Sequence, residues 1–288
     1  MDKYKKIIDD WEKFKEYSEE HQQPAIRKNS LKAGEDFEKK LGNDFEYEHA
    51  DWNSNIYRLN TKNPGKSMLQ WRGDFYVQEE SAALPVKVLD PQPGEEILDM
   101  CAAPGGKTTQ IAARTNNSAD IIANDDSKHR IQTLQMNIYR TGSVVTVTNY
   151  DGCHLPEDRK YDRILLDAPC TGEGDRYRKN FEAADEGEKQ ELAQLQKELI
   201  EKAAKLLKEG GTLIYSTCTI NTAENESVVQ HAVENTSLET ENIETDIKHV
   251  RGVEQFEDKE YSPQMKDTVR VYPHHFNSGV IYVAKFTK

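Results

Sequence analysis

Short apolar segments alternate with amphipathic segments from residue 96 onward, and this alternation constrains the fold more than any other feature. Segments with the length and composition of buried strands cover residues 96–100, 121–124, 144–149, 163–168 and 212–216. Amphipathic helices are predicted to begin near Lys107, Ser127 and Glu188, the last of them ending at the glycine pair 210–211. Strands that alternate with helices over short connections pair in parallel. The sequence therefore predicts an α/β fold with a doubly wound parallel sheet.

The first 70 residues follow a different pattern. Residues 4–18 carry apolar side chains at helical spacing, which predicts an amphipathic helix. A short strand in AIRKNSLKAG and a second helix containing Phe37 and Leu41 are expected next. We therefore expect a small α+β accessory domain over residues 1–70 and the α/β domain over residues 71–288, which GVIYVAKF closes with a final strand.

The chain is acidic, with a formal net charge of −13 at pH 7, which argues against a uniformly basic nucleic-acid-binding surface. Its basic residues nevertheless form four local groups, namely Arg27, Lys28 and Lys32; Arg58, Lys62 and Lys66; Arg176, Arg178 and Lys179; and Lys266, Arg270, His274 and His275. A basic face on an acidic body and an ordinary solvated acidic surface both remain open. The histidine pair His274 and His275 could bind phosphate or cap the site, but a surface pair beside Pro273 is the expectation.

Composition also limits the class of protein. No segment approaches the roughly 18 consecutive apolar residues of a membrane span, and MDKYKKIIDDWEK lacks the features of a signal peptide. We therefore expect a cytoplasmic protein with no membrane partner. The four cysteines form no C-x-x-C pair, which argues against a zinc site and a disulfide framework, so no metal is expected.

Two of these cysteines follow predicted strands. Cys170 comes after RILLDA and Cys218 after TLIYS, so both thiols are expected at the carboxyl edge of the sheet, where open α/β folds bind ligands. Asp167 lies three residues before Cys170. A soft nucleophile beside a carboxylate suits addition to an electron-poor ring. The alternative is a pair of small buried hydrophobes, which two thiols on adjacent strands make less attractive.

The first predicted strand ends in MCAAPGGKT, whose glycine pair opens a helix and lets a ligand approach the backbone. A Walker A loop is excluded because Cys101 stands where its first glycine is required. Asp125 lies about twenty residues beyond this turn, as an acceptor for ribose hydroxyls does. Helix capping by Asp125 or Asp126 is the alternative. Asp151 can accept from an adenine amino group or simply form an Asp-Gly turn.

An adenosine site without a phosphate loop suggests S-adenosylmethionine, and two thiols suggest methyl transfer to an unreactive carbon such as C5 of cytosine. A thiolate that adds to C6, while an acid protonates N3, makes C5 nucleophilic. After transfer the C5 proton leaves and the thiol is eliminated. Cys218, Asp167 and Cys170 can supply the nucleophile, the acid and help in release. The chemistry alone does not tell the two thiols apart.

The motifs MCAAPGGKT, DAPCTGEG and YSTCT, in this order, resemble those of the Sun-type RNA (cytosine-5) methyltransferases over nearly the whole chain. The resemblance implies a Rossmann-like catalytic domain that uses S-adenosylmethionine. It implies Cys218 as nucleophile, Cys170 in product release, Lys107 beside the reactive centre and Asp167 at the cytosine edge. It also implies cofactor contacts from Cys101, Ala102, Ala103, Pro104, Gly105, Gly106, Lys107, Asp125, Arg130, Asp151 and Asp167.

The compact length resembles that of the archaeal tRNA members that lack a PUA domain, so a monomer acting on tRNA is expected, with the N-terminal region recognising the RNA. Ribosomal RNA is the alternative substrate. A non-catalytic RNA-binding assembly factor is a second hypothesis, disfavoured because both cysteines, Asp167 and the AAPGGK loop are retained. DNA methylation is disfavoured because the resemblance places the nucleophile in the Ser-Thr-Cys-Thr segment.

Overall fold

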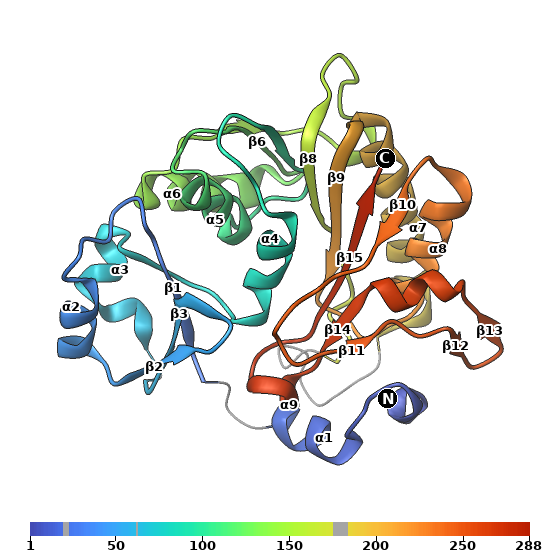
Figure 1. Ribbon diagram of the computed structural model, residues 1–288, viewed down its shortest axis with the longest axis horizontal. Coiled ribbons are helices and arrows are strands. Elements are labelled where there is room, and N and C mark those ends of the chain that lie inside the picture. The colour runs from blue at the N-terminus through green and yellow to red at the C-terminus, as the bar shows by residue number, and fades with distance from the viewer. Residues whose placement is uncertain (20–22, 62, 175–183) are drawn as a thin grey trace.

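The computed structural model describes residues 1–19, 23–61, 63–174 and 184–288, and a large sheet forms its centre (Figure 1). This sheet runs in the order β11 (Val250–Arg251), β14 (Val269–Val271), β15 (Ile281–Thr287), β9 (Leu207–Thr217), β8 (Tyr161–Asp167), β5 (Glu96–Asp99), β6 (Asp120–Asn124) and β7 (Thr146–Thr148), with β10 (Glu239–Glu241) paired to β15. Strands β7, β6, β5, β8 and β9 pair in parallel, which confirms the predicted sheet. The predicted closing strand, β15, pairs with β9 antiparallel.

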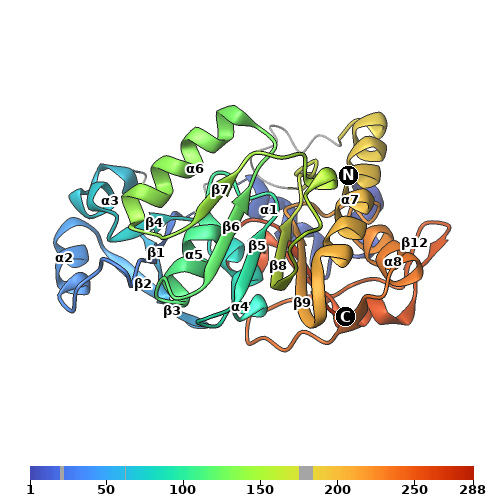
Figure 2. The ribbon, with the colours of Figure 1, turned by 90° about the horizontal axis from the view of Figure 1, so that it is seen from above.

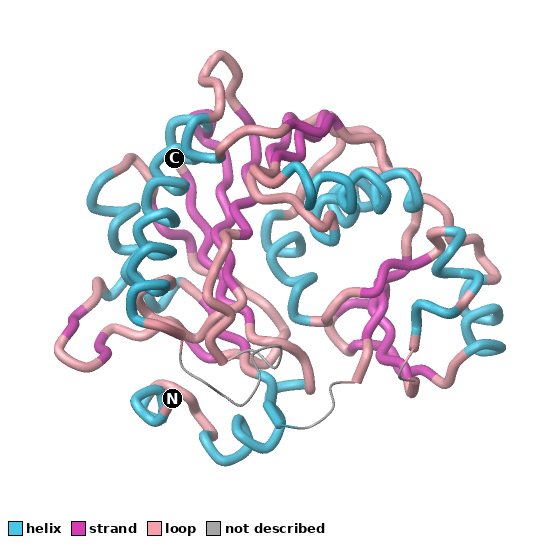
Figure 3. Tube along the Cα trace, turned by 180° about the vertical axis from the view of Figure 1, so that it is seen from behind, coloured by secondary structure: helices cyan, strands magenta, loops and turns pink. Residues whose placement is uncertain are grey.

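Helices cover both faces of this sheet (Figures 2 and 3). They are α4 (Leu84–Leu89), α5 (Gly106–Arg114), α6 (Lys128–Thr141), α7 (Glu186–Leu206) and α8 (Glu226–Asn235). Successive strand residues point to opposite faces, so Ile97 and Leu165 pack with α4 and α5, whereas Leu98 and Leu166 pack with α7 and α8. Burial on both faces explains why these strands are apolar throughout. In the described part of the chain, no helix combines the length and apolarity needed to cross a membrane.

The glycine pair 210–211 does not end a helix, contrary to the prediction. Helix α7 ends at Leu206, and β9 begins at the next residue, Leu207. Gly210 adopts φ +74° inside β9, where the register between β8 and β9 shifts. The pair therefore forms a bulge, which needs the positive φ that glycine tolerates.

A smaller sheet forms the N-terminal lobe. Its order is β2 (Tyr47–Ala50), β3 (Asn53–Leu59), β1 (Ala25–Lys28) and β4 (Phe75–Val77), and the nearby helices are α2 (Phe37–Asp44), α3 (Met68–Arg72) and the 3-10 helix η2 (Pro64–Lys66). The strand in AIRK and the helix containing Phe37 and Leu41 are as predicted. Because β4 belongs to this sheet, the sheet continues past residue 70, and the division into two domains stays a prediction.

The predicted helix over residues 4–18 is interrupted. A 3-10 helix, η1 (Asp2–Lys6), precedes α1 (Trp11–Glu19), because Asp10 accepts the Lys13 N–H at 3.1 Å and thereby starts a new helix. Both pieces pack against the large domain rather than the small sheet: Tyr4 and Phe14 belong to the core formed with α7 and α8.

The histidine pair was predicted on the surface and is buried instead. His274 and His275 lie on α9 (Pro273–Phe276), and their side chains have no exposed area. Their Nε2 atoms lie 2.8 and 3.2 Å from Asp9 Oδ1. Burial lowers the pKa of His275 to about 4 despite the opposing carboxylate. The pair therefore fastens the N-terminal segment to the last turn before β15.

Candidate active site

The two predicted thiols lie together at the carboxyl edge of the large sheet. Cys170 follows β8 and Cys218 follows β9, and Asp167 is paired with Ser216 in the register of these parallel neighbours. The two Sγ atoms are 3.1 Å apart, and the Cys218 N–H donates to Cys170 Sγ at 3.3 Å. Cys218 is exposed and Cys170 partly exposed, so a ring entering this edge can reach either thiol.

A charged pair lies at the same edge. Lys107 Nζ donates to Asp167 Oδ2 at 2.7 Å, and Ser216 Oγ donates to Asp167 Oδ1 at 2.7 Å. Burial lowers the pKa of the Lys107 ammonium, but the Asp167 carboxylate, together with Cys218, outweighs it and raises that pKa above its usual value. Lys107 therefore carries a proton and fixes one oxygen of Asp167, while Ser216 fixes the other.

A pocket of about 220 Å³ opens at this pair. Its lining comes from β4, the end of β5 and the glycine loop, namely Tyr76, Val77, Gln78, Ala82, Asp99, Cys101, Ala102, Ala103, Pro104, Gly106, Lys107 and Asp167. Gly105 adopts φ +103°, and a Cβ there would lie 2.9 Å from Leu134, so the loop requires glycine at this position. The predicted loop residues 101–104, 106 and 107 thus line one pocket next to the thiols.

Asp99 contributes a buried carboxylate to this pocket. Its Oδ2 accepts from Thr108 Oγ1 at 2.7 Å, while Oδ1 has no hydrogen-bond partner among the described residues. Burial, opposed by that hydrogen bond, raises the pKa of Asp99 to about 7. An unpaired buried acceptor is matched by a ligand that brings donors or positive charge. S-adenosylmethionine carries an ammonium and a sulfonium, so the pocket fits this cofactor.

Asp125 and Arg130 support the loop in the structure. Asp125 is buried, and its carboxylate accepts the N–H groups of Ala103 and Ser127, each at 3.1 Å. Arg130 Nη1 lies 3.5 Å from Asp125, and Nη2 donates to the Ala103 carbonyl. The structure thus places both residues behind the loop rather than in the lining of the pocket. Their contact with a ribose stays a prediction.

Asp151 lies apart from the pocket lining. It caps a 3-10 helix, η4 (Gly152–His154), by accepting the Cys153 N–H at 2.9 Å, and its other oxygen is 2.9 Å from His154 Nδ1. The hydrogen bond from the Cys153 N–H holds the pKa of Asp151 below its usual value. The side chain is 59% exposed. The adenine contact expected of it also stays a prediction.

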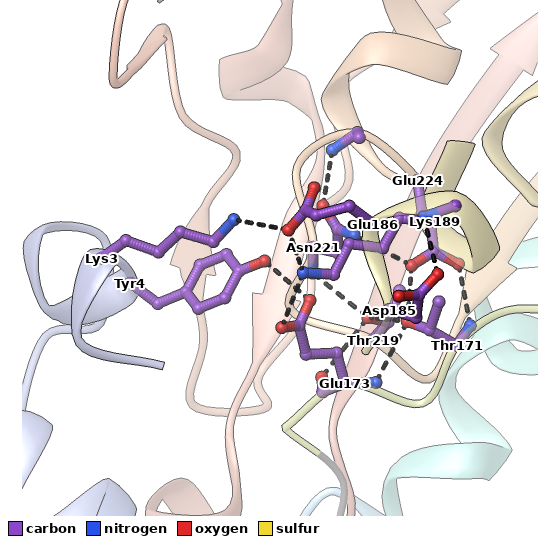
Figure 4. A network of polar contacts seen from close by, with 12 residues as sticks. Lys3, Tyr4, Thr171, Glu173, Asp185, Glu186, Lys189, Thr219, Asn221 and Glu224 are labelled. Atoms are coloured by element: carbon purple, nitrogen blue, oxygen red, sulfur yellow. Dashed lines mark hydrogen bonds and ion pairs between the residues drawn. The ribbon is translucent and has the colours of Figure 1, made fainter. Parts of the chain in front are cut away.

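A buried polar network holds the two cysteine-bearing loops (Figure 4). Glu224 accepts the Thr171 N–H at 2.8 Å and the Thr171 hydroxyl at 2.6 Å. The same carboxylate accepts from Gln196 Nε2, which also donates to the carbonyl of Pro169 at 2.8 Å. Thr219, next to Cys218, lies 3.2 Å from Thr171 Oγ1. Glu224 therefore fixes the residues on both sides of Cys170.

The N-terminal segment joins this network through Glu173 (Figure 4). Tyr4 donates its hydroxyl to Glu173 Oε2 at 2.8 Å, and Lys189 of α7 lies 3.2 Å from Oε1. The Glu173 carbonyl accepts the Ile220 N–H at 2.9 Å, which links the two loops through their backbones. The first residues of the chain thus stabilise a loop more than 160 positions away.

Sequence reasoning missed Asp99 and Glu224. Asp99 ends the strand EILD directly before the glycine loop, and a charged residue closing an apolar strand is the signal that could have found it. Glu224 stands in AENE, six residues after Cys218, and no local spacing shows that it reaches Thr171.

Part of the predicted basic surface is internal. Arg27 is buried and donates to the Gly106 carbonyl at 2.7 Å and to Thr109 Oγ1 at 2.9 Å. Arg270 is buried against Glu226, with an Nε–Oε1 distance of 2.7 Å. Both therefore support the fold and do not present charge to a ligand. Four of the other predicted basic residues lie outside the described residues, namely Lys62, Arg176, Arg178 and Lys179.

The fold and this site define a Rossmann-like methyltransferase with two thiols at its reaction edge. The sequence model described as "16S rRNA methyltransferase RsmB/F" matches residues 86–287. The chain therefore belongs to the RsmB/F, or Sun-type, family of RNA cytosine-C5 methyltransferases. Enzymes of this family depend on S-adenosylmethionine, and the crystal structure of NSun6 from Pyrococcus horikoshii contains SFG, an analogue of that cofactor.

Individual relatives differ in how much of their length the chain spans. A tRNA (cytosine(49)-C(5))-methyltransferase of Pyrococcus abyssi is 37% identical over 297 residues, covering 100% of this chain and 95% of the relative. The 25S rRNA (cytosine-C(5))-methyltransferase nop2 of Schizosaccharomyces pombe is 39% identical over 229 residues, covering 75% of this chain but 37% of the relative.

Solved structures support the fold. A methyltransferase homolog protein from Pyrococcus horikoshii superposes with a TM-score of 0.86 at 31% identity, covering 96% of this chain and 90% of that one. The NSun6 structure superposes with a TM-score of 0.82 at 23% identity, covering 96% and 94% of the two chains.

Proposed function

We propose that this protein methylates C5 of cytosine in tRNA through a covalent adduct of Cys218. The observation that carries the proposal is the 3.1 Å separation of the two thiols beside the Lys107–Asp167 pair. Cytosine C5 is not nucleophilic until a thiolate adds to C6, so the reaction needs a thiol, a proton donor at N3 and a base for the C5 proton. S-adenosylmethionine, when bound, supplies the methyl group.

Each residue at the edge has a separate duty in this proposal. The Cys218 thiolate forms a bond to C6, and Asp167 contacts the N3 edge of the ring, to which the Lys107–Asp167 pair supplies the proton. Cys170 assists the release of the methylated product: its sulfur accepts the proton from C5, the C5–H electron pair restores the C5–C6 double bond, and the Cys218–C6 bond breaks to return the Cys218 thiolate. Lys107 orients Asp167 through the 2.7 Å contact, and its positive charge favours the Cys218 thiolate.

The choice of tRNA over ribosomal RNA rests on the extent of the match to each relative. The tRNA-modifying relative matches this chain along 95% of its own length, whereas the yeast rRNA relative carries a large additional part that this chain does not match. We further propose a monomer that acts in the cytoplasm, for which light scattering and fractionation are direct checks. Ribosomal RNA remains the alternative substrate because the same catalytic core serves both.

Bisulfite sequencing tests the proposed function. Unmodified total RNA is incubated with the purified protein and S-adenosylmethionine, and Cys218→Ala serves as the matched control. The proposal predicts cytosines in tRNA that resist deamination with the wild-type protein and not with the variant. Protection confined to ribosomal RNA would show that ribosomal RNA, and not tRNA, is the substrate. RNA binding without protection of any cytosine would favour the non-catalytic RNA-binding factor.

A further inference from the structure

Two stretches of the sequence contain no acidic residue. Residues 52–73 and 127–150 hold neither Asp nor Glu, although the chain has 51 acidic residues among 288. Each stretch does hold basic residues, including Lys66 in the first and Lys128 in the second. The exposed Asp44, which lies outside both stretches, accepts from Ser67 Oγ at 2.6 Å, so the surface that they form is poor in carboxylates. Such a surface on an otherwise acidic protein is suited to a polyanionic ligand.

The fold brings these stretches together, since α3 belongs to the first and α6 to the second (Figures 1 and 2). Arg140 Nη1 of α6 donates to the carbonyl of Gln70 in α3 at 3.0 Å. Lys32 Nζ donates to the carbonyls of Arg72 and Arg140 at 3.2 and 2.8 Å. A Cβ at Gly73, which ends α3, would lie 1.9 Å from the Arg140 carbonyl, so the backbones touch.

At the contact between α3 and α6, the charged side chains of Arg140 and Lys32 donate to uncharged groups, so these hydrogen bonds do not neutralise them. The oxygens that accept hydrogen bonds from Arg140 belong to backbone carbonyls and to Asn137, and those that accept from Lys32 belong to carbonyls. Asp74, the acid that follows the first stretch, lies 3.3 Å from Arg72 and is buried. Lys128, at the start of α6, is exposed.

The exposed large apolar side chains of the described residues gather in the same two stretches. They are Met68, Trp71, Met136, Tyr139, Val144 and Tyr150. Trp71 is 73% exposed and directly follows Gln70, and Tyr139 is 88% exposed and directly precedes Arg140. Gln70 and Arg140 are the residues that join α3 to α6. Single exposed apolar residues need no explanation, but the confinement of all six to two stretches that meet through α3 and α6 favours a binding surface there.

Helix α6 also contacts the glycine loop that lines the reaction pocket. At the start of α6, Arg130 donates to the carbonyl of Ala103, and in its middle Asn137 Nδ2 donates to the Pro104 carbonyl at 2.9 Å. Lys128, Met136 and Tyr139 are exposed at helical spacing along one side of α6. Tyr139 lies about 14 Å beyond Arg130 along the helix axis.

We propose that Trp71 and Tyr139 form a stacking platform for unpaired bases of the RNA that flank the target cytosine, with Lys66 and Lys128 contacting phosphates. This inference rests on the proposed function, because it takes the ligand to be RNA. Unpaired RNA bases stack on aromatic side chains, and each such contact contributes about 1–3 kcal/mol. An aromatic and basic face has the chemistry that this ligand requires, and α6, which carries part of this face, also contacts the glycine loop through Arg130 and Asn137.

The test separates RNA binding from catalysis. The variants Trp71→Ala and Tyr139→Ala are each expected to raise Kd and KM for tRNA about tenfold, with kcat and the Kd for S-adenosylmethionine within a factor of two. Trp71→Phe, which keeps an aromatic ring, is expected to bind nearly as well as the wild type. Rescue by phenylalanine distinguishes stacking from a general loss of structure, which thermal melting also monitors.

Charge is tested separately. Lys128→Glu is expected to raise Kd and flatten its salt dependence, whereas Lys259→Glu, an identical change at an exposed position on β13 (Lys259–Glu260), is expected to leave both unchanged. The proposed platform is contradicted if the wild type methylates tRNA and the Trp71→Ala/Tyr139→Ala double variant binds that tRNA as tightly as the wild type does. A wild type that neither binds nor methylates RNA would instead overturn the proposed function, and the platform with it.

Discussion

The Sγ atoms of Cys170 and Cys218 lie 3.1 Å apart, although 48 positions separate the two residues in the chain. Parallel pairing of β8 with β9 produces this proximity, because each cysteine follows the end of one of these neighbouring strands. A cytosine bonded to one sulfur therefore has the other beside it. Attack and release can take place at one position without rearrangement of the sheet.

The same proximity predicts reversible inactivation by oxidation. A disulfide has an S–S distance of about 2.05 Å, so the two sulfurs need to move together by only about 1 Å. Hydrogen peroxide is expected to remove two protons and two electrons from the thiols, giving the disulfide and two water molecules. The number of free thiols found by titration should fall from four to two, and dithiothreitol should restore activity. Cys153→Ala is the control and should lose activity as the wild type does; inactivation without loss of a thiol pair would contradict the account.

Glu224→Gln is expected to disorder the loop that carries Cys170. The amide would place a donor against the donors of Thr171, Gln196 and Asn221, which all face the carboxylate at present. We expect a loss of about 2–3 kcal/mol in the free energy of unfolding and a fall in kcat at unchanged Kd for the cofactor. Denaturant titration and methyl-transfer kinetics measure these effects. The exposed Glu239→Gln is the matched control, and equal stability of the two variants would exclude this role.

Asp99 is expected to make the protein less stable as the pH rises. Its pKa is raised to about 7 by burial, so between pH 4 and pH 7 the folded state keeps a proton that the unfolded state releases. Raising the pH through this range therefore favours unfolding, by about 3 kcal/mol between pH 5 and pH 8. Asp99→Asn should remove most of that loss, whereas Asp126→Asn, at an exposed position, should retain it. Thermal melting between pH 5 and pH 8 measures the difference. Identical dependence of the melting temperature on pH for the wild type and Asp99→Asn would contradict this prediction.

Much of the large sheet was predictable because its signals are local. Buried parallel strands are apolar along their whole length, and each ends in residues of a different character, as RILLDA does before Pro169 and Cys170. Once two such strands are neighbours, the positions of Cys170 and Cys218 at one edge follow. The loop over residues 101–107 was found in the same way, since its glycines show a close backbone approach.

The features that sequence reasoning missed depend on contacts between distant segments. Asp9 meets His274 across 265 positions, and this contact turns an expected surface pair into a buried one. Arg27 was grouped with surface charges, but the fold buries it under the Gly106 carbonyl. Such partners leave no periodic signal in the sequence, so local patterns could not predict them.

Trapping of the covalent adduct tests the central claim, the division of labour between the two thiols. Radiolabelled tRNA is incubated with S-adenosylmethionine and each cysteine variant, then resolved on a denaturing gel, with circular dichroism as a control for folding. Cys170→Ala is predicted to accumulate a slowly migrating protein–RNA band because release stalls, and Cys218→Ala to give no band and no methylation. A band with Cys218→Ala and none with Cys170→Ala would show that the two roles are reversed.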